Sequence, residues 1–247
     1  MNKRSSFSER RNRISQKQVS EDFDRLTSAY EEKVNEALAF GGYEHGFYID
    51  VKRDEILRQA RERFICLDAL EVLDLGCGIG AYHFGLEAKF ARLHGIDVSP
   101  RSVEIARQNH PFVDYASFDG GDLPYAENRF DLIFTICVMH HVPPLQWQSF
   151  AREIHRTLKP GGLVLVFEHN PYNPATQFIV RSCEIDKDAV LLKPFEVRRL
   201  FSDAGFEDVR TRTILSVPPA GKILFWLDRM LGYLPFGAQY YMSASKS

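Results

Sequence analysis

The chain has 247 residues, of which 45% are hydrophobic and 26% are charged, and its formal net charge is −2 at pH 7. This length suffices for one α/β domain with appendages and does not require a second domain. A charge this close to zero excludes the strongly basic composition of many nucleic-acid-binding proteins, so we expect no nucleic-acid partner.

The four cysteines stand at positions 66, 77, 137 and 183, with no paired spacing. Neither a zinc site nor a disulfide framework is therefore predicted, and we expect no metal. The first residues lack the apolar segment of a signal peptide, and no apolar run reaches the roughly 18 residues that span a bilayer. These features favour a cytoplasmic protein.

The N-terminal segment divides into a basic tail and a helical region. Residues 1–18 carry six basic side chains and one acid, with little apolar surface, so we expect a disordered tail. Ser20 and the two acids after it are typical of a helix start, and one helical face would carry Phe23, Leu26 and Tyr30. With a second helix expected over 51–67, residues 19–68 are interpreted as an N-terminal helical cap.

Strands and helices then alternate along residues 69–247, which we interpret as the core. The first strand is expected to end at the glycine loop 76–80, and the final apolar stretch is expected to form the last strand. Further strands are expected over 93–98, 113–118, 130–138, 163–167 and 207–213. Helices are expected over 81–91, 100–108, 144–158 and 194–204. This spacing predicts an α/β fold, a Rossmann-like, doubly wound seven-stranded sheet, mostly parallel with an antiparallel last strand. The segments 169–193 and 216–236 are interpreted as insertions that form a substrate cap.

The loop Gly76-Cys77-Gly78-Ile79-Gly80 follows the first strand, where a doubly wound sheet binds its ligand. Glycines allow a tight turn and a close approach of the ligand to the backbone. With Ala81, the loop also fits the dinucleotide pattern GxGxxA, which keeps an NAD-dependent oxidoreductase as an alternative. Asp97 ends the second strand and could accept both hydroxyls of a ribose, as either cofactor requires.

Four motifs in order resemble those of the class I S-adenosylmethionine-dependent methyltransferases: VLDLGCGIG, HGIDVSPRSVEIAR, FDGGDLPYAENRFDLIFTICVMHHV and LKPGGLVLVFE. The resemblance extends from about residue 23 to 213. It implies S-adenosylmethionine as cofactor, with binding residues Tyr30, Asp74, Gly76, Cys77, Gly78, Gly80, Asp97, Val98, Asp119, Gly120 and Val138. Other roles stay open for three of these residues: Asp74 could bond loop amides, Asp119 could cap a turn, and Tyr30 could be core.

Histidines are the candidate catalytic groups, because a hydroxyl acceptor gives up a proton and imidazole titrates near neutral pH. His140, His141 and His169 all follow expected strand ends. Packing at the strand ends is the alternative role for the His140-His141 pair. In the insertion that follows, Asn170 and Arg181 are candidate substrate residues, and Arg181 could hold an anionic group.

The acceptor is expected to be a small or lipid-linked molecule, methylated at oxygen. The insertion 216–236 is rich in large apolar residues, which suits a membrane interface, an acceptor channel, or packing on the core or on a second subunit in a homodimer. The alternative function is a non-catalytic methyltransferase fold that acts through a partner.

Overall fold

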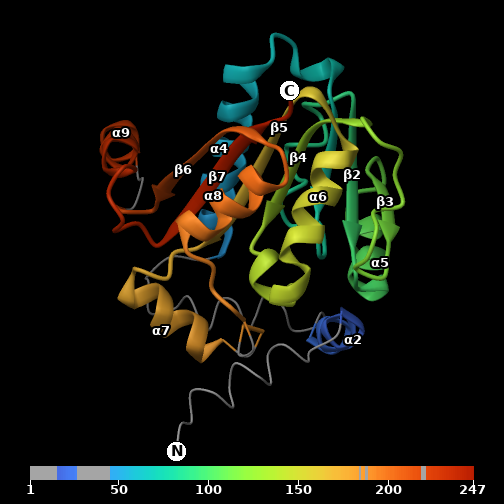
Figure 1. The fold of residues 1–247 in the computed structure, drawn as a ribbon, viewed down its shortest axis with the longest axis horizontal. Coiled ribbons are helices and arrows are strands. Elements are labelled where there is room, and N and C mark those ends of the chain that lie inside the picture. The colour runs from blue at the N-terminus through green and yellow to red at the C-terminus, as the bar shows by residue number, and fades with distance from the viewer. Residues whose placement is uncertain (1–15, 27–44, 184, 187–188, 218–220) are drawn as a thin grey trace, which may run out of the picture.

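The computed structural model describes residues 16–26, 45–183, 185–186, 189–217 and 221–247. Its centre is a seven-stranded sheet of order β3-β2-β1-β4-β5-β7-β6 (Figure 1). The strands are β1 (Glu71–Leu75), β2 (Arg92–Asp97), β3 (Asp114–Ser117), β4 (Phe130–Ile136), β5 (Leu158–His169), β6 (Glu207–Ile214) and β7 (Gln239–Ser245). β1 to β5 pair in parallel, whereas β7 runs antiparallel to both β5 and β6. The predicted doubly wound, mostly parallel fold with an antiparallel last strand is confirmed.

Helices cover both faces of this sheet. They are α2 (Gln16–Leu26), α4 (His45–Arg63), α5 (Pro100–Asn109), α6 (Trp147–Thr157), α7 (Pro174–Ser182), α8 (Pro194–Asp203) and α9 (Gly221–Leu231). Figure 1 shows α6 and α8 in front of the sheet and α4 behind it. α2 and α7 lie beyond one end of the sheet, close to the carboxyl ends of the parallel strands.

Alternation along the central strands divides the core into two layers, because successive side chains of a strand point to opposite faces. In β1, Leu73 and Leu75 pack with Ile154 of α6 and Phe201 of α8. The intervening Val72 packs on the opposite face with residues of α4. Both faces of the sheet are therefore buried, as parallel sheets require.

The helix predicted over 81–91 is wrong. This segment is a succession of turns, in which the amides of His83, Leu86 and Lys89 each bond the carbonyl three residues earlier. Gly85 has a φ of 80°, which an α-helix cannot accommodate. The glycine thus interrupts a segment whose apolar spacing is otherwise typical of a helix.

The N-terminal helix α2 begins at Gln16, four residues before the expected start at Ser20. Ser20 lies inside the helix, and its hydroxyl donates to the carbonyl oxygen of Val98 at 2.6 Å. This bond ties α2 to the end of β2. Most of the predicted tail, residues 1–15, and the predicted aromatic Tyr30 fall outside the described residues.

The insertion before the last strand forms α9, which is fixed by one buried carboxylate. Asp228 accepts hydrogen bonds from the amides of Leu215, Ser216 and Val217 at 2.6–3.1 Å. The helix is thereby held at the exit of β6. Within the described ranges, every helix falls short of the length and apolarity that crossing a bilayer demands.

Candidate functional site

A cavity opens at the carboxyl ends of the parallel strands. Its walls come from the glycine loop after β1, the ends of β2 and β4, and the last residue of β5. α2 and α4 add Phe23, Tyr48 and Lys52, and the segment after α7 adds Ile185 and Asp186. The cavity therefore lies where a doubly wound sheet binds its ligand.

The glycine loop has a left-handed backbone at three positions, with φ values of 84° at Gly76, 52° at Gly78 and 79° at Gly80. The amides of Gly76 and Cys77 donate to the carbonyl of Ile96 at 2.8 and 3.0 Å, which holds the loop against β2. A Cβ on Gly76 would overlap the side chain of Val138, whereas a Cβ on Gly78 would meet no atom within 4 Å. Gly76 is thus required for packing, and Gly78 leaves open space.

Asp97 joins the loop to the next helix. Its Oδ2 accepts the amide of Gly78 at 2.8 Å, and its Oδ1 accepts the amide of Ser99 at 2.9 Å. Burial raises the pKa of this carboxyl to about 6, although the backbone bonds oppose the rise and Asp74 adds to it. Each carboxylate oxygen has a second lone pair, so Asp97 can still accept ligand hydroxyls.

Asp74 also lines the cavity and is held by a histidine that the sequence analysis did not single out. Nε2 of His83 lies 2.9 Å from Oδ2 of Asp74, and Nδ1 of the same ring lies 2.5 Å from the hydroxyl of Tyr115. Burial raises the pKa of Asp74, and His83 only partly offsets this. The carboxylate thus faces the cavity from a fixed position.

The remaining predicted cofactor residues separate into two groups. Cys77, Val98, Gly120 and Val138 line the cavity, together with the residues above. Gly80 and Asp119 are not among the described lining residues, and Oδ1 of Asp119 accepts the amide of Gly121 at 3.0 Å. Asp119 therefore fixes the backbone beside Gly120 in this structure.

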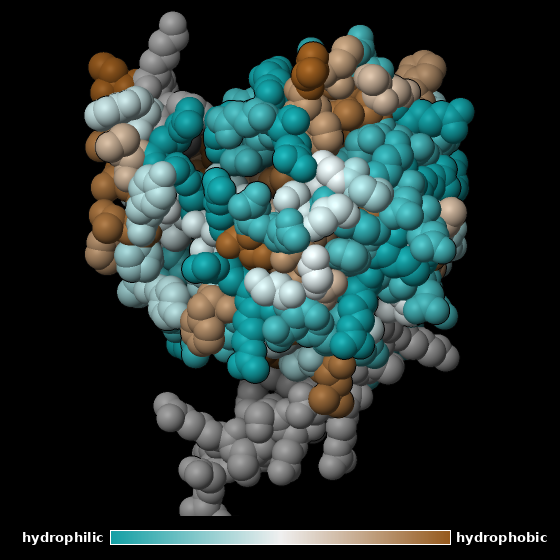
Figure 2. Space-filling view, turned by 45° about the horizontal axis from the view of Figure 1, so that its top comes forward, coloured by the Kyte–Doolittle hydropathy of each residue, from teal (hydrophilic) through white to brown (hydrophobic). Residues whose placement is uncertain are grey.

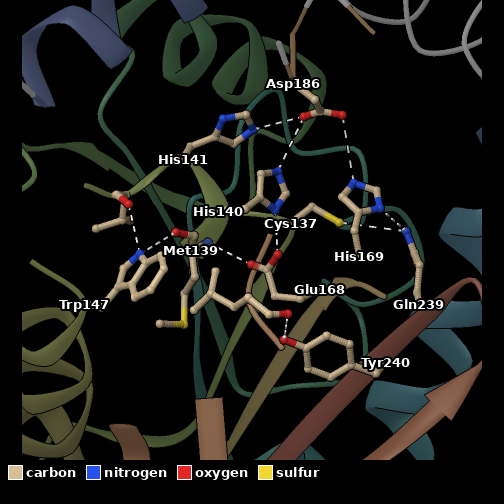
Figure 3. Close-up of polar contacts among 12 residues, drawn as sticks. Cys137, Met139, His140, His141, Trp147, Glu168, His169, Asp186, Gln239 and Tyr240 are labelled. Atoms are coloured by element: carbon tan, nitrogen blue, oxygen red, sulfur yellow. Dashed lines mark hydrogen bonds and ion pairs between the residues drawn. The ribbon is translucent and has the colours of Figure 1, made fainter. Parts of the chain in front are cut away.

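A buried ion pair lies behind the cavity wall that contains His141 and His169 (Figure 3). Nδ1 of His140 is 2.5 Å from Oε2 of Glu168, and Oε1 of Glu168 accepts the amide of Met139 at 2.8 Å. Burial lowers the pKa of His140, but Glu168 and Asp186 outweigh it, and the net shift is upward. His140 does not line the cavity; it lies beneath the residues that do.

His141 and His169 do face the cavity, and Asp186 lies between them (Figure 3). Oδ1 of Asp186 is 3.3 Å from Nε2 of His141, and its Oδ2 is 4.0 Å from Nε2 of His169. Despite the opposing effect of burial, the histidines hold the pKa of Asp186 well below its usual value. The carboxylate is therefore ionised at neutral pH.

Cys137 lies at the same wall, at the end of β4, with a φ of 57°. Its sulfur is 3.9 Å from both Nζ of Lys52 and Nε2 of Gln239. Burial raises the pKa of Cys137, but Lys52 and His169 outweigh it and lower it overall. Lys52 is the only lysine or arginine among the described lining residues.

The structure places both predicted substrate residues outside the cavity lining. Asn170 is fully buried and outside the cavity lining; its amide donates to the carbonyls of Pro235 and Gly237, and its Oδ1 accepts the amide of Tyr172. Arg181 is exposed and bonds Gln177 on its own helix, away from the described lining. Asn170 instead anchors the chain that leads into β7.

No role was predicted from the sequence for Lys52, Glu168 or Asp186. Lys52 lies inside an apolar helical pattern, and Asp186 stands in a segment without clear periodicity. Glu168 directly precedes His169 at the end of an expected strand, and this position was the feature of the sequence that could have identified it as a site residue.

A family model described as "Methyltransferase domain" matches residues 73–166. An uncharacterized methyltransferase of Synechocystis sp. is 40% identical over 145 residues, which are 57% of this chain and 68% of that protein. A ubiquinone biosynthesis O-methyltransferase of Cereibacter sphaeroides is 36% identical over 39% of this chain and 40% of its own length.

The fold has solved counterparts. A structure from Thermotoga maritima, described as an S-adenosylmethionine-dependent methyltransferase and possible histamine N-methyltransferase, has a TM-score of 0.62 at 19% identity; the match covers 93% of this chain and 100% of that one. The glycine loop, Asp97 and the strand order agree with the similarity in sequence to the methyltransferases named above. The chain belongs to the class I S-adenosylmethionine-dependent methyltransferases.

Proposed function

We propose that this enzyme methylates an oxygen atom of a small acceptor that enters the cavity beside His169. The observation that carries the proposal is the continuity of the cavity, whose walls include the glycine loop and Asp97 as well as His141 and His169. A donor and an acceptor could therefore meet in one enclosed space. Such proximity is the main catalytic requirement when the leaving group is already activated.

The lining residues suit the cofactor. Gly78 leaves open space, and Asp97 retains free lone pairs for the hydroxyls of a ribose. Val98 and Gly120 would flank the adenine, and Asp74 would hold the methionine end. When bound, S-adenosylmethionine supplies a methyl group on a positively charged sulfur, which needs no further activation.

His169 would accept the proton that an acceptor hydroxyl loses. Its ring lines the cavity, and its Nδ1 lies 3.4 Å from Nε2 of Gln239 on β7, which orients the imidazole. Apolar neighbours such as Ile136, Val142 and Phe150 would keep water from the reacting atoms. His140, in contrast, lies outside the cavity lining and is held by Glu168.

The acceptor class is proposed to be lipid-linked. α9 and the turn after it expose Ile223, Trp226, Met230, Tyr233 and Phe236, each more than half exposed. Figure 2 shows this brown patch along the left edge of the molecule, over α9. The one carboxylate of α9 is buried, Arg229 is exposed, and Trp and Tyr are the residues that membrane interfaces favour. A lipid surface is therefore the occupant that we assign to this face.

Methyl-labelled S-adenosylmethionine and fractionated bacterial extract would test the reaction. We expect label in lipid or small metabolites, on oxygen, and at least a tenfold loss of incorporation for His169→Gln. His155→Gln, on α6 away from the cavity, is the matched control. Label confined to protein or RNA would overturn the proposal.

Vesicle sedimentation would test the lipid surface separately. With mixed neutral and anionic phospholipid vesicles we expect wild-type binding, and its loss in Trp226→Ser with Met230→Ser. Phe195→Ser, an exposed aromatic on α8, is the control. A dimer in sedimentation velocity that dissociates in the α9 variant would instead assign the patch to a subunit interface.

A further inference from the structure

Three potential ligand atoms converge at the acceptor end of the cavity. Among the described residues, His140, His141 and Asp186 each offer one atom, and these atoms all lie within 4.8 Å of one another. Oδ1 of Asp186 is 3.4 Å from Nε2 of His140 and 3.3 Å from Nε2 of His141. Ligand atoms about 2.0–2.1 Å from a tetrahedral metal lie about 3.4 Å from one another. The carboxylate thus already lies at about coordination spacing from each of the two rings.

One of these atoms has an unmet bonding requirement. Nε2 of His140 makes no hydrogen bond within the described part of the chain, although the residue is only 1% exposed. Its contact with Oδ1 of Asp186, at 3.4 Å, is too long for a good hydrogen bond, and a buried polar atom without a hydrogen bond is costly. Because this atom points toward Asp186 (Figure 3), a cation between them would satisfy it.

The other side of the same ring has the partner that a metal-binding histidine usually has. Nδ1 of His140 lies 2.5 Å from the buried carboxylate of Glu168, which also holds the amide of Met139. Such a carboxylate holds the proton on Nδ1, so the opposite nitrogen can bind a cation once it has released its own proton. Glu168 therefore prepares Nε2 of His140 as a ligand.

We propose that His140, His141 and Asp186 form a binding site for a divalent transition-metal cation. Two imidazole nitrogens and one carboxylate favour zinc, cobalt, manganese or iron over magnesium and calcium, which prefer oxygen ligands. His141 and Asp186 line the cavity, so further coordination positions face the acceptor. Three protein ligands with an open position are characteristic of catalytic metal sites.

The role of this cation rests on the proposed function. The cation would bind the acceptor oxygen and favour loss of the hydroxyl proton. His169, which lies on the other side of Asp186 from the cation, would accept that proton. Nε2 of His169 is 4.0 Å from Oδ2 of Asp186, so His169 stays free of the ligand set. Metal binding itself requires no acceptor.

Binding should be measured on protein stripped with a chelator, by titration calorimetry with Zn²⁺ and by the visible spectrum of the Co²⁺ form. We expect about one equivalent of Zn²⁺, the spectrum of a four- or five-coordinate Co²⁺ site with nitrogen and oxygen ligands, and no binding of Mg²⁺. His141→Gln and Asp186→Asn, at partly exposed positions, should each weaken Zn²⁺ binding at least tenfold.

His155→Gln and Asp203→Asn are the matched controls, because both lie outside the cavity lining. An unchanged circular-dichroism spectrum and thermal unfolding midpoint in all four variants would verify folding. Wild type that takes up no Zn²⁺, or variants that bind it as tightly as wild type, would overturn the metal site. Metal-loaded protein that methylates nothing would overturn the proposed function and leave the metal site intact.

Discussion

Oε2 of Glu168 lies 2.5 Å from Nδ1 of His140, and both side chains are buried. Through its other oxygen, Glu168 also holds the amide of Met139 at 2.8 Å. One carboxylate at the end of β5 therefore fixes both the backbone and a ring in the turn after β4. Burial alone would raise the pKa of Glu168, but His140 outweighs it and keeps the pKa low.

We expect Glu168→Ala to lower the free energy of unfolding by about 3–5 kcal/mol, because it leaves His140 without its buried partner. Urea denaturation would measure the change. Asp203→Ala, which removes an exposed ion pair with Arg199, should cost less than about 1 kcal/mol. Equal losses in the two variants would contradict a special role for the buried pair.

Gly76→Ala should mainly reduce stability, whereas Gly78→Ala should mainly reduce cofactor affinity. The first adds a methyl group that overlaps Val138, so we expect about 2–4 kcal/mol of destabilisation. The second adds a methyl group in open space at the cavity, so stability should fall by about 1 kcal/mol while affinity for S-adenosylhomocysteine falls at least tenfold.

The control for Gly78→Ala is Gly161→Ala. Gly161 also has a positive φ, of 77°, with no atom near its Cβ position, but it lies outside the cavity lining. Its substitution should match the small stability loss without changing cofactor affinity. A similar loss of affinity in both variants would mean that Gly78 acts through folding alone.

Asp97→Ala should weaken S-adenosylhomocysteine about 10–100-fold, because hydrogen bonds to a charged acceptor contribute about 1.5–3 kcal/mol. Calorimetry is the measurement, and Asp122→Ala, at an exposed position, is the control. Asp119→Ala tests the predicted adenine contact, for which we expect about a threefold to tenfold loss. Unchanged binding in Asp97→Ala would remove this residue from the site.

Cofactor affinity should also depend on pH through Asp97, whose pKa of about 6 lies above its unfolded value. Below pH 6 the carboxyl of the free protein is protonated, and binding to ribose hydroxyls must release that proton. Affinity for S-adenosylhomocysteine is therefore expected to rise between pH 5 and pH 7, more in wild type than in Asp97→Asn. The stability of the ligand-free protein changes in the opposite direction. Because the pKa of Asp97 is higher in the folded than in the unfolded chain, its ionisation lowers the free energy of unfolding as pH rises through about 4–6.

Lys52 is expected to bind the carboxylate of the methionine end of the cofactor. Its Nζ lies 3.2 Å from the hydroxyl of Tyr82, just after the glycine loop, and the side chain is buried. Lys52→Gln should weaken S-adenosylhomocysteine at least tenfold and leave 5′-methylthioadenosine, which lacks that carboxylate, unaffected. Lys89→Gln, at an exposed position, is the control. An equal loss for both ligands would place Lys52 elsewhere in the mechanism.

Local patterns in the sequence were sufficient for most of the fold. Apolar strands alternating with helices predicted the doubly wound sheet, because burial on both faces makes parallel strands continuously apolar. The helix over 81–91 was wrong because Gly85 adopts a φ of 80°, and apolar spacing carries no information on the sign of φ.

The sequence by itself was sufficient to predict that Gly76, Gly78 and Asp97 line one cavity, since they lie within about one βαβ unit and their geometry is local. Only the tertiary structure decided which side chains form the opposite wall of the cavity. It brings Asp186 beside His141, buries His140 against Glu168, and turns Arg181 and Asn170 away from the cavity lining. These relationships join the ends of β4 and β5 with the segment after α7, and long-range packing, rather than residue type or spacing, sets which side chains meet there.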